Sequence, residues 1–321
     1  MRVLVTGAAG FIGGELCLAL LGRHFEVFGI DNLNSYYDVN LKLARLERVR
    51  SLPGFQFEVC DISDMKHLSE IFCRFSPDVV VNLAAQAGVR YSITDPESYT
   101  KSNLVGFANV LECCRRNSVQ HLVFASSSSV YGECKKVPFN EEDRVDNPVS
   151  YYAATKKANE LMAASYANLY GMQVTGLRFF TVYGPWGRPD MAAWLFTSAI
   201  LSGRPIKIFN QGRMKRDFTY ISDIVEGVCR IIEKKDLLDA KYNIFNIGNN
   251  HPVELADFIR AIEEACGKEA KKEYLPMQNG DVTTTYADIS KLYKFVQYKP
   301  STGLSQGVGN FVRWYREYHN I

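Results

Sequence analysis

Tyr152 and Lys156, four positions apart, are the two residues of this sequence that most directly suggest proton-transfer chemistry. Residues 151–170 predict a helix, and side chains at positions i and i+4 share one helix face. A free phenol has a pKa of about 10 and is a poor base at neutral pH. A neighbouring ammonium group favours the phenolate, so we expect Lys156 to lower the pKa of Tyr152. By itself the Tyr-x-x-x-Lys spacing is common by chance, and the alternative is an exposed helix face.

Four consecutive serines, residues 126–129, follow a strand expected at residues 121–125. In parallel α/β folds, ligands bind beyond the carboxyl ends of the strands. A hydroxyl at Ser127 can hydrogen-bond a substrate oxygen and assist proton transfer. We therefore predict Ser127, Tyr152 and Lys156 as catalytic residues. A serine-rich strand end without a catalytic role is the alternative.

A glycine-rich turn, residues 6–13, lies between an expected strand at 3–5 and an expected helix at 11–21. Its glycines allow a tight turn and the close approach of a pyrophosphate to the helix N-terminus. An ordinary βα turn is the alternative interpretation. The residues predicted to line a dinucleotide here are Gly7, Gly10, Phe11, Ile12 and Gly13.

Asp31 lies at the end of the next expected strand, directly after residues 26–30, and can accept hydrogen bonds from an adenosine ribose. Its charge would repel a 2′-phosphate, and residues 32–34, beginning with Asn32, supply no arginine to offset this. We therefore predict NAD rather than NADP as the cofactor.

Two further strand ends carry candidate cofactor contacts. Asp61 and Ile62 are placed to meet the adenine, although a helix N-cap is an equally good explanation for Asp61. Leu83, Ala84 and Ala85 follow the strand expected at 79–83, and the two small alanines there allow a cofactor to pass closely.

Short apolar runs alternate with amphipathic stretches over about the first 180 residues. Strands are expected at residues 3–5, 26–30, 55–59, 79–83, 121–125 and 173–177, and helices at 11–21, 65–75, 99–117 and 151–170. This alternation predicts an α/β fold with a doubly wound parallel sheet, the Rossmann arrangement. Residues 1–178 are predicted to bind the cofactor. Residues 179–321, with a helix expected at 191–202, are predicted to form mainly a smaller mixed α/β substrate domain, some segments of which return to the first.

Composition narrows the class of protein. The 321 residues carry 37 basic and 35 acidic side chains and a net charge of +2, which gives no basic patch for nucleic acid. The eight cysteines lack a C-x-x-C or other metal-ligand spacing, which predicts reduced thiols, no metal site and a cytoplasmic location. No signal peptide and no apolar stretch of about 18 residues is found, so we expect no membrane segment.

Three motifs in order resemble the extended short-chain dehydrogenase/reductase family over essentially the whole chain. They are T-G-x-x-G-x-x-G at 6–13, Ser-Ser-x-x-Val-Tyr-Gly at 126–132 and Y-x-x-x-K at 152–156. Within that family, residues 87–92, 178–192 and 214–221 resemble the UDP-glucuronate 4-epimerases. One departure is Ser222, where such relatives commonly carry an acidic residue before Asp223.

The resemblance implies roles by position. NAD would also be lined by Asn103, Tyr152, Lys156 and Phe179. Arg216 would bind the diphosphate and Asp281 the uridine ribose, while Thr181, Arg188 and Ser127 to Ser129 would meet the sugar and its carboxylate. Arg188 and Arg216 could instead belong to a solvated face. The other substrate contacts implied are Arg90, Tyr152, Met191, Ala192, Lys207, Phe209 and Gln278.

The resemblance also implies a reaction. Tyr152 would take the C4 hydroxyl proton while the C4 hydride passes to tightly bound NAD. The 4-keto sugar would rotate in the site and be reduced on the opposite face of C4. This reaction interconverts UDP-glucuronate and UDP-galacturonate, which would serve polysaccharide synthesis. Because the 4-keto uronate is a β-keto acid, its carboxylate must be held away from the geometry of decarboxylation. Thr181 and the serine hydroxyls are candidate clamps, and Arg188 is a candidate charge partner. A homodimer through helices 99–117 and 151–170 is implied as well.

Several alternatives remain open from the sequence. A UDP-glucuronate decarboxylase differs chiefly in this clamp, and another UDP-hexose or UDP-N-acetylhexosamine 4-epimerase would share the same motifs. A 4,6-dehydratase is disfavoured because Ser128 and Ser129 stand where such relatives carry Asp-Glu. A non-catalytic NAD-sensing protein is disfavoured by the intact Ser127, Tyr152 and Lys156.

Overall fold

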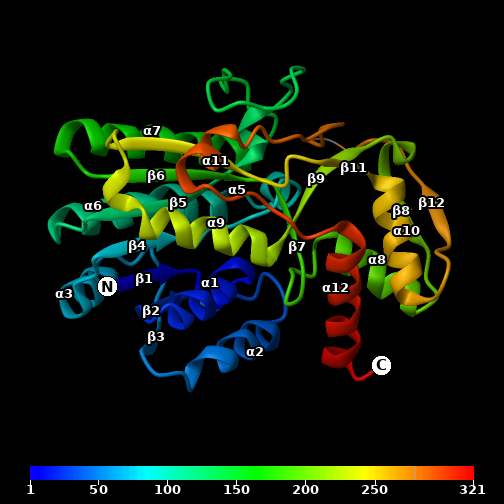
Figure 1. Ribbon diagram of the computed structural model, residues 1–321, viewed down its shortest axis with the longest axis horizontal. Coiled ribbons are helices and arrows are strands. Elements are labelled where there is room, and N and C mark those ends of the chain that lie inside the picture. Colours follow the sequence, from blue (N-terminus) through cyan, green and yellow to red (C-terminus); the bar gives the residue numbers. More distant parts are fainter. Residues whose placement is uncertain (279) are drawn as a thin grey trace.

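The computed structural model describes residues 1–278 and 280–321, and a parallel sheet of seven strands forms its centre (Figure 1). The strand order is β10-β6-β5-β4-β1-β2-β3. The strands are β1 (Arg2–Thr6), β2 (Glu26–Asp31), β3 (Phe55–Val59), β4 (Val79–Asn82), β5 (His121–Ser127), β6 (Val174–Phe179) and β10 (Tyr242–Ile247). The six strands predicted from the sequence are confirmed to within two residues at each end, and β10 was not predicted.

The strand order creates a switch point beside β1. From β1 the chain runs outward through β2 to β3, and then crosses back to β4 on the other side of β1. The loops after β1 and β4 therefore diverge, which leaves a crevice at the carboxyl edge of the sheet. The glycine-rich turn and residues 83–85 border this crevice, so the fold brings together two segments predicted to contact the cofactor.

Helices cover both faces of the sheet (Figure 1). This explains why the strands are continuous apolar runs, since both faces of each strand are buried. One face carries α1 (Phe11–Gly22), α2 (Val39–Arg50), α9 (Ile221–Glu233) and α11 (Ser290–Val296), and the other carries α3 (Met65–Phe75), α6 (Phe107–Arg116) and α7 (Tyr151–Tyr170). The doubly wound α/β class predicted from the sequence is confirmed.

The helix expected at residues 99–117 is wrong in its detail. A π-helical turn, η1 (Thr100–Gly106), precedes the regular helix α6, which ends at Arg116. A π-turn inserts an extra residue and shifts the helix register, and such turns often occur at functional sites. Here the inserted turn directs Asn103 inward, where it is buried.

The smaller part of the molecule lies at the right of Figure 1, around a core of aromatic and aliphatic side chains. Phe218 and Phe258 stack in it with ring centroids 3.9 Å apart. Its strands are β7 (Thr181–Tyr183), β9 (Lys215–Tyr220) and β11 (Pro252–Glu254) in one sheet and β8 (Ile206–Ile208) with β12 (Lys272–Tyr274) in another. Its main helices are α8 (Ala192–Leu201), α10 (Leu255–Cys266) and α12 (Leu304–His319).

Short helical turns complete the chain. They are α4 (Tyr91–Thr94), α5 (Pro96–Tyr99), η2 (Ser128–Tyr131), η3 (Phe209–Gly212) and η4 (Lys235–Leu237). Helix α2 was not predicted, although Asp38 caps its first turn by accepting a hydrogen bond from the Asn40 amide. Leu41, Leu46 and Val49 form its apolar side. None of the helices in the described ranges is long and apolar enough to cross a membrane.

Candidate active site

A cleft of about 1300 Å³ runs along the carboxyl edge of the seven-stranded sheet toward the smaller part of the molecule. This volume exceeds that of a typical single-ligand pocket, which is about 300–1000 Å³. With two exceptions, Asn103 and Gln278, every residue predicted to touch cofactor or substrate lines it. From the predicted cofactor set these are Gly7, Gly10, Phe11, Ile12, Gly13, Asp31, Asn32, Asp61, Ile62, Leu83, Ala84, Ala85, Tyr152, Lys156 and Phe179. From the predicted substrate set they are Arg90, Ser127, Ser128, Ser129, Tyr152, Thr181, Arg188, Met191, Ala192, Lys207, Phe209, Arg216 and Asp281.

The glycine-rich turn fits a dinucleotide pyrophosphate. Gly7 has a φ of +72°, and a Cβ atom added to it would lie 2.8 Å from the Ala84 backbone nitrogen. A Cβ on Gly13 would lie 2.1 Å from the Gly7 oxygen, so neither position accepts a side chain. In the described part of the chain, no side chain caps the N-terminus of α1 at Gly10. The positive end of that helix dipole therefore faces the cleft, and the first turn of α1 carries no acidic side chain.

The Asp31 carboxylate is held in one orientation at the end of β2. Its two oxygens accept hydrogen bonds from the backbone amides of Ala9 at 3.2 Å and Leu33 at 2.8 Å. Burial raises the pKa of Asp31, while the charge of Lys42 opposes that rise. Each oxygen keeps a free lone pair, which suits the hydroxyls of a ribose. The cleft also contains Lys42 from α2, which the sequence interpretation did not consider; its ammonium donates to Asn34.

The two explanations offered for Asp61 are now distinguished. The N-cap of α3 is Asp64, which accepts hydrogen bonds from the amides of Lys66 and His67. The cap explanation for Asp61 is therefore wrong. Asp61 instead accepts hydrogen bonds from the Ser63 amide at 2.9 Å and hydroxyl at 2.8 Å, and lines the cleft.

Asn103 supports the cleft from behind. Its oxygen accepts a hydrogen bond from the Gln86 amide, and its nitrogen donates to the Gln86 carbonyl and the Thr155 hydroxyl. These hydrogen bonds hold the Gln86 segment to α7, and the cofactor contact implied for Asn103 stays a prediction. Gln278 also lies outside the cleft lining, and within the described residues its side-chain oxygen is buried without a hydrogen-bond partner.

The three predicted catalytic residues converge at the end of β5 and the first turns of α7. The Lys156 ammonium donates to the Ala125 carbonyl at 2.8 Å and lies 6.0 Å from the centre of the Tyr152 ring. The Ser127 hydroxyl accepts a hydrogen bond from the Ser129 amide at 3.1 Å. This bond caps the N-terminus of η2 and fixes the orientation of the hydroxyl. The geometry thus places a phenol, an ammonium and a hydroxyl at one point of the cleft.

The expected lowering of the Tyr152 pKa is wrong for the protein by itself. Burial raises the pKa of Tyr152, although a hydrogen bond with Ser127 and the charge of Arg188 oppose it. Burial also lowers the pKa of Lys156 to about 8. The Lys156 ammonium is directed at the Ala125 carbonyl rather than at the phenol. Desolvation therefore determines whether the pKa of each group rises or falls.

Three side chains from two distant segments meet in the cleft, Arg188 and Asp190 from one loop and Tyr36 from another. Arg188 donates from Nε and Nη2 to the Asp190 carboxylate at 3.0 and 2.5 Å, and the Tyr36 hydroxyl donates to Asp190 at 3.2 Å. The Arg188 side chain is 21% exposed, which excludes the solvated-face alternative for this residue. The charge of Arg188 opposes the rise in the pKa of Tyr152, and both side chains line the same cleft.

The other two predicted arginines, Arg216 and Arg90, also line the cleft. Arg216 donates to the carbonyls of Lys215 and Thr283, and burial lowers its pKa. Arg90 pairs with Asp281 at 3.1 Å and lies over the Phe209 ring at 4.9 Å. Two guanidinium groups and one carboxylate therefore belong to the lining of the cleft.

Sequence reasoning missed several residues that line the cleft, among them Tyr36, Lys42, Gln86 and Asp190. Asp190 lies within a stretch that resembled relatives, but no local pattern assigns it a partner. Gln86 is the clearest candidate for a ligand contact among them. Its side-chain nitrogen is buried and, among the described residues, has no hydrogen-bond partner. Within residues 1–278 and 280–321, no cluster of His, Cys, Asp or Glu is placed to hold a metal ion.

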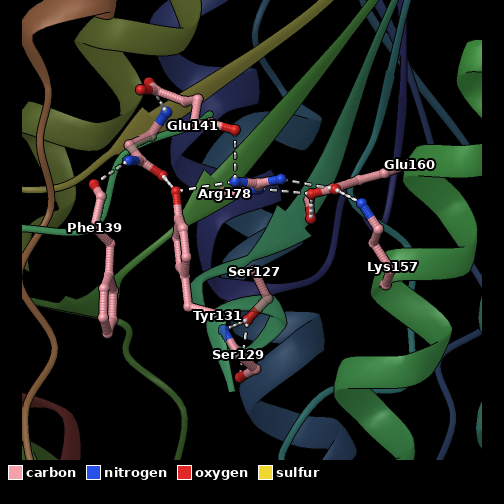
Figure 2. Close-up of polar contacts among 10 residues, drawn as sticks. Ser127, Ser129, Tyr131, Phe139, Glu141, Lys157, Glu160 and Arg178 are labelled. Carbon is pink, nitrogen blue, oxygen red and sulfur yellow. Dashed lines mark hydrogen bonds and ion pairs between the residues drawn. The ribbon is translucent and has the colours of Figure 1, made fainter. Parts of the chain in front are cut away.

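A buried ion pair lies beneath the serines. Arg178 and Glu160 are joined by two hydrogen bonds of 2.8 and 2.9 Å. Figure 2 shows the Arg178 guanidinium between Glu160 on one side and Tyr131 on the other, with Ser127 and Ser129 nearby. Tyr131 accepts from Arg178 at 3.0 Å. The network joins β6 to α7 and η2, and the Ser126 hydroxyl, which donates to Glu160 at 2.7 Å, adds the end of β5 next to Ser127.

The doubly wound sheet and the cleft at its carboxyl edge together define an enzyme that depends on a dinucleotide. Residues 3–248 match the model of the NAD dependent epimerase/dehydratase family. The chain therefore belongs to this family, and the family resemblance seen in its motifs is confirmed.

Individual relatives match over most or all of their length. Protein CapI of Staphylococcus aureus is 48% identical over 333 residues, which cover 99% of both chains. UDP-glucuronate 4-epimerase 4 of Arabidopsis thaliana is 48% identical over 337 residues, covering 100% of this chain and 76% of the relative. The structure of UDP-glucuronic acid 4-epimerase from Bacillus cereus, in complex with UDP-glucuronic acid and NAD, is 36% identical with a TM-score of 0.93, covering 99% of this chain and 100% of that chain.

Proposed function

We propose that the protein is a UDP-glucuronate 4-epimerase that interconverts UDP-glucuronate and UDP-galacturonate with bound NAD. The observation that carries this proposal is the position of Arg188, a largely buried cation that lines the same cleft as Tyr152 and the serines. A neutral hexose has no need of a guanidinium beside its reacting carbon, whereas the carboxylate of a uronic acid does. Relatives with this activity match the whole chain.

The residues that would hold NAD are those of the glycine-rich turn, Asp31, Asp61 and the 83–85 segment. When bound there, NAD supplies the acceptor for the hydride that leaves C4 and the donor that returns it. Lys156, held by the Ala125 carbonyl, presents its charge at the sheet edge next to Tyr152. The protein contributes position and proton transfer.

Tyr152 is the proton acceptor for the C4 hydroxyl in this proposal. Ser127 donates a hydrogen bond to the same sugar oxygen. That oxygen carries partial negative charge while the C4 ketone forms and again while the ketone is reduced. Because burial raises the pKa of Tyr152, positive charge nearby must favour the phenolate when substrate reacts. Arg188 already acts in that direction, and Lys156 adds to it if its ammonium turns from Ala125.

The carboxylate must be held away from the orientation in which a β-keto acid loses carbon dioxide. Thr181 on β7 and the hydroxyls of Ser128 and Ser129 line the cleft beside Tyr152. Arg188, which pairs with Asp190 in the structure, supplies the balancing positive charge. The substrate carboxylate either replaces Asp190 as its partner or binds beside it. We propose that these four side chains restrain rotation about the C5–carboxylate bond.

The test is to incubate the purified protein with UDP-glucuronate, without added NAD, and to resolve the products by chromatography and proton NMR. UDP-galacturonate alone is the expected product. A pentose product such as UDP-xylose would reassign the protein as a decarboxylase, and no reaction with or without NAD would remove the substrate assignment. A Tyr152→Phe variant serves as the control, because it keeps the ring and removes the proton acceptor.

We further propose a division of labour along the chain, with residues 1–178 binding NAD and residues 179–321 mainly binding the UDP-sugar. In support, β10 and α9 come from the second segment yet pack on the first sheet, as segments that return would do. A fragment of residues 1–178 alone would lack β10, so domain roles are best tested in the full chain by binding of NAD and UDP separately.

A homodimer in the cytoplasm is the proposed state of the protein. Leu161 and Leu169 on α7 are 61% and 70% exposed, and Val105 on η1 is 48% exposed. Apolar side chains gathered on two neighbouring helices favour association with a second copy. The eight cysteines are free thiols, which suits a reducing compartment. Sedimentation of the wild type and of Leu161→Glu tests the dimer; a monomeric wild type would contradict it.

A further inference from the structure

Arg45 is a completely enclosed arginine that the mechanism above does not use. It lies on α2 with 1% of its surface exposed, and its guanidinium makes five hydrogen bonds. Nη1 donates to the Ala9 carbonyl at 3.2 Å and to the Tyr37 hydroxyl at 2.6 Å. Nε and Nη2 donate to the Trp186 carbonyl at 3.0 and 2.7 Å, and Nη2 also donates to the Gly187 carbonyl at 3.0 Å.

These acceptors belong to two different parts of the site. Ala9 is inside the glycine-rich turn that would hold the cofactor pyrophosphate. Trp186 and Gly187 directly precede Arg188, the cation at the substrate end of the cleft. One guanidinium group therefore joins the cofactor turn to the loop that carries Arg188.

The loop needs such support because of its backbone. Trp186 has a φ of +64°, the left-handed region that bulky side chains disfavour. A strained conformation of this kind persists only where surrounding contacts enforce it. The Trp186 ring is held by Arg48 at 4.8 Å and by the ring of Trp314 at 5.2 Å, while Arg45 holds the Trp186 carbonyl.

We propose that Arg45 is a positioning residue that couples the cofactor turn to Arg188 and thereby sets the preference of the cleft for a carboxylate-bearing sugar. A lysine cannot replace it, because the planar guanidinium reaches acceptors on two sides while an ammonium group is a single point of charge. The inference deepens the proposed function and rests on it, since it assumes that the substrate carboxylate meets Arg188.

The experiment compares Arg45→Lys and Arg45→Met with the wild type, all loaded with NAD. Calorimetry gives the Kd of UDP-glucuronate and of UDP, which shares the nucleotide but lacks the sugar. The matched control is Arg230→Met, which removes an arginine that also donates to backbone carbonyls, those of Val296 and Gln297, but lies away from the cleft. Acrylamide quenching of tryptophan fluorescence reports, independently of substrate, on the cluster of Trp186, Trp194 and Trp314.

For both Arg45 variants we expect the Kd of UDP-glucuronate to rise about tenfold, the equivalent of one charge-assisted hydrogen bond, and that of UDP to change less than about twofold. The share of decarboxylated product and the quenching of tryptophan should both rise. Arg230→Met should lower thermal stability without these changes. If Arg45→Met does not fold, Arg45→Lys carries the comparison.

Two results have different meanings. An unchanged ratio of the two Kd values and unchanged quenching in Arg45→Lys would overturn the positioning role, whatever happens to the melting temperature. A wild type that binds UDP-glucuronate no better than UDP, or does not convert it, would refute the proposed function. The carboxylate preference assigned to Arg45 would fall with it, while the quenching comparison would still show whether Arg45 holds the loop.

Discussion

The ion pair between Arg178 and Glu160 allows a quantitative prediction about stability. The two side chains are 3% and 2% exposed and share two hydrogen bonds (Figure 2). Replacing Glu160 by Gln keeps the shape but leaves the Arg178 charge buried without a counter-charge. Breaking one side of a buried pair typically costs about 3–5 kcal/mol. We therefore expect Glu160→Gln to lower the free energy of unfolding by about 3 kcal/mol or more.

Equilibrium unfolding in urea, followed by circular dichroism, measures this cost. The matched control is Glu254→Gln, which breaks the exposed pair with Lys215, where both side chains are about half exposed. The free energy of unfolding of this control should fall by less than about 1 kcal/mol. A double variant Glu160→Leu/Arg178→Met should cost less than the sum of its single changes, because neither charge remains unpaired. A Glu160→Gln variant as stable as the control would refute the electrostatic reasoning.

The ion pair between Arg178 and Glu160 also predicts how the free energy of unfolding depends on pH. Burial would raise the pKa of Glu160, but the hydrogen bonds and charge of Arg178 hold it below its usual value. A carboxyl whose folded pKa is depressed stabilises the protein above its unfolded pKa, and this stabilisation is lost as the pH falls through the folded pKa. Unfolding measured between pH 6 and pH 3 should therefore show a smaller acid dependence in the double variant than in the wild type.

Three further predictions concern the cleft. The pKa of Lys156 is lowered to about 8 by burial, so its cation is lost as the pH rises through 8, and kcat/KM should decline there; a constant kcat/KM up to about pH 9.5 would contradict this. Thr181→Ala should produce a decarboxylated pentose product detectable by proton NMR, and full activity without that product would show that Thr181 is no clamp. Asp31→Asn removes the charge that would repel a 2′-phosphate, so NADP binding measured by calorimetry should improve about tenfold relative to NAD, whereas an unchanged ratio would assign the discrimination elsewhere.

Much of the cofactor end could be predicted from the sequence because its signals are local. The glycines of the turn, Asp31 at a strand end, and the pair Tyr152 and Lys156 each depend on spacing within one or two elements. The six predicted strands are recognisable because a strand buried on both faces must be apolar throughout. Asp61 shows the limit of local reasoning, since a carboxylate near a helix start suits either a cap or a ligand contact, and only the positions of Lys66 and His67 relative to Asp64 decided between them.

The substrate end depends on contacts between distant segments, which leave no periodic signal in the chain. Arg45 meets Trp186 across 141 positions, and Tyr36 meets Asp190 across 154. The direction of the Tyr152 pKa was also decided by the tertiary structure, because burial and the orientation of Lys156 toward Ala125 outweigh sequence proximity. The sequence by itself thus determined the fold class and the residue types available for proton transfer. Only the folded chain decided which charges lie side by side, since electrostatic interaction depends on distance and on exclusion of water rather than on order along the chain.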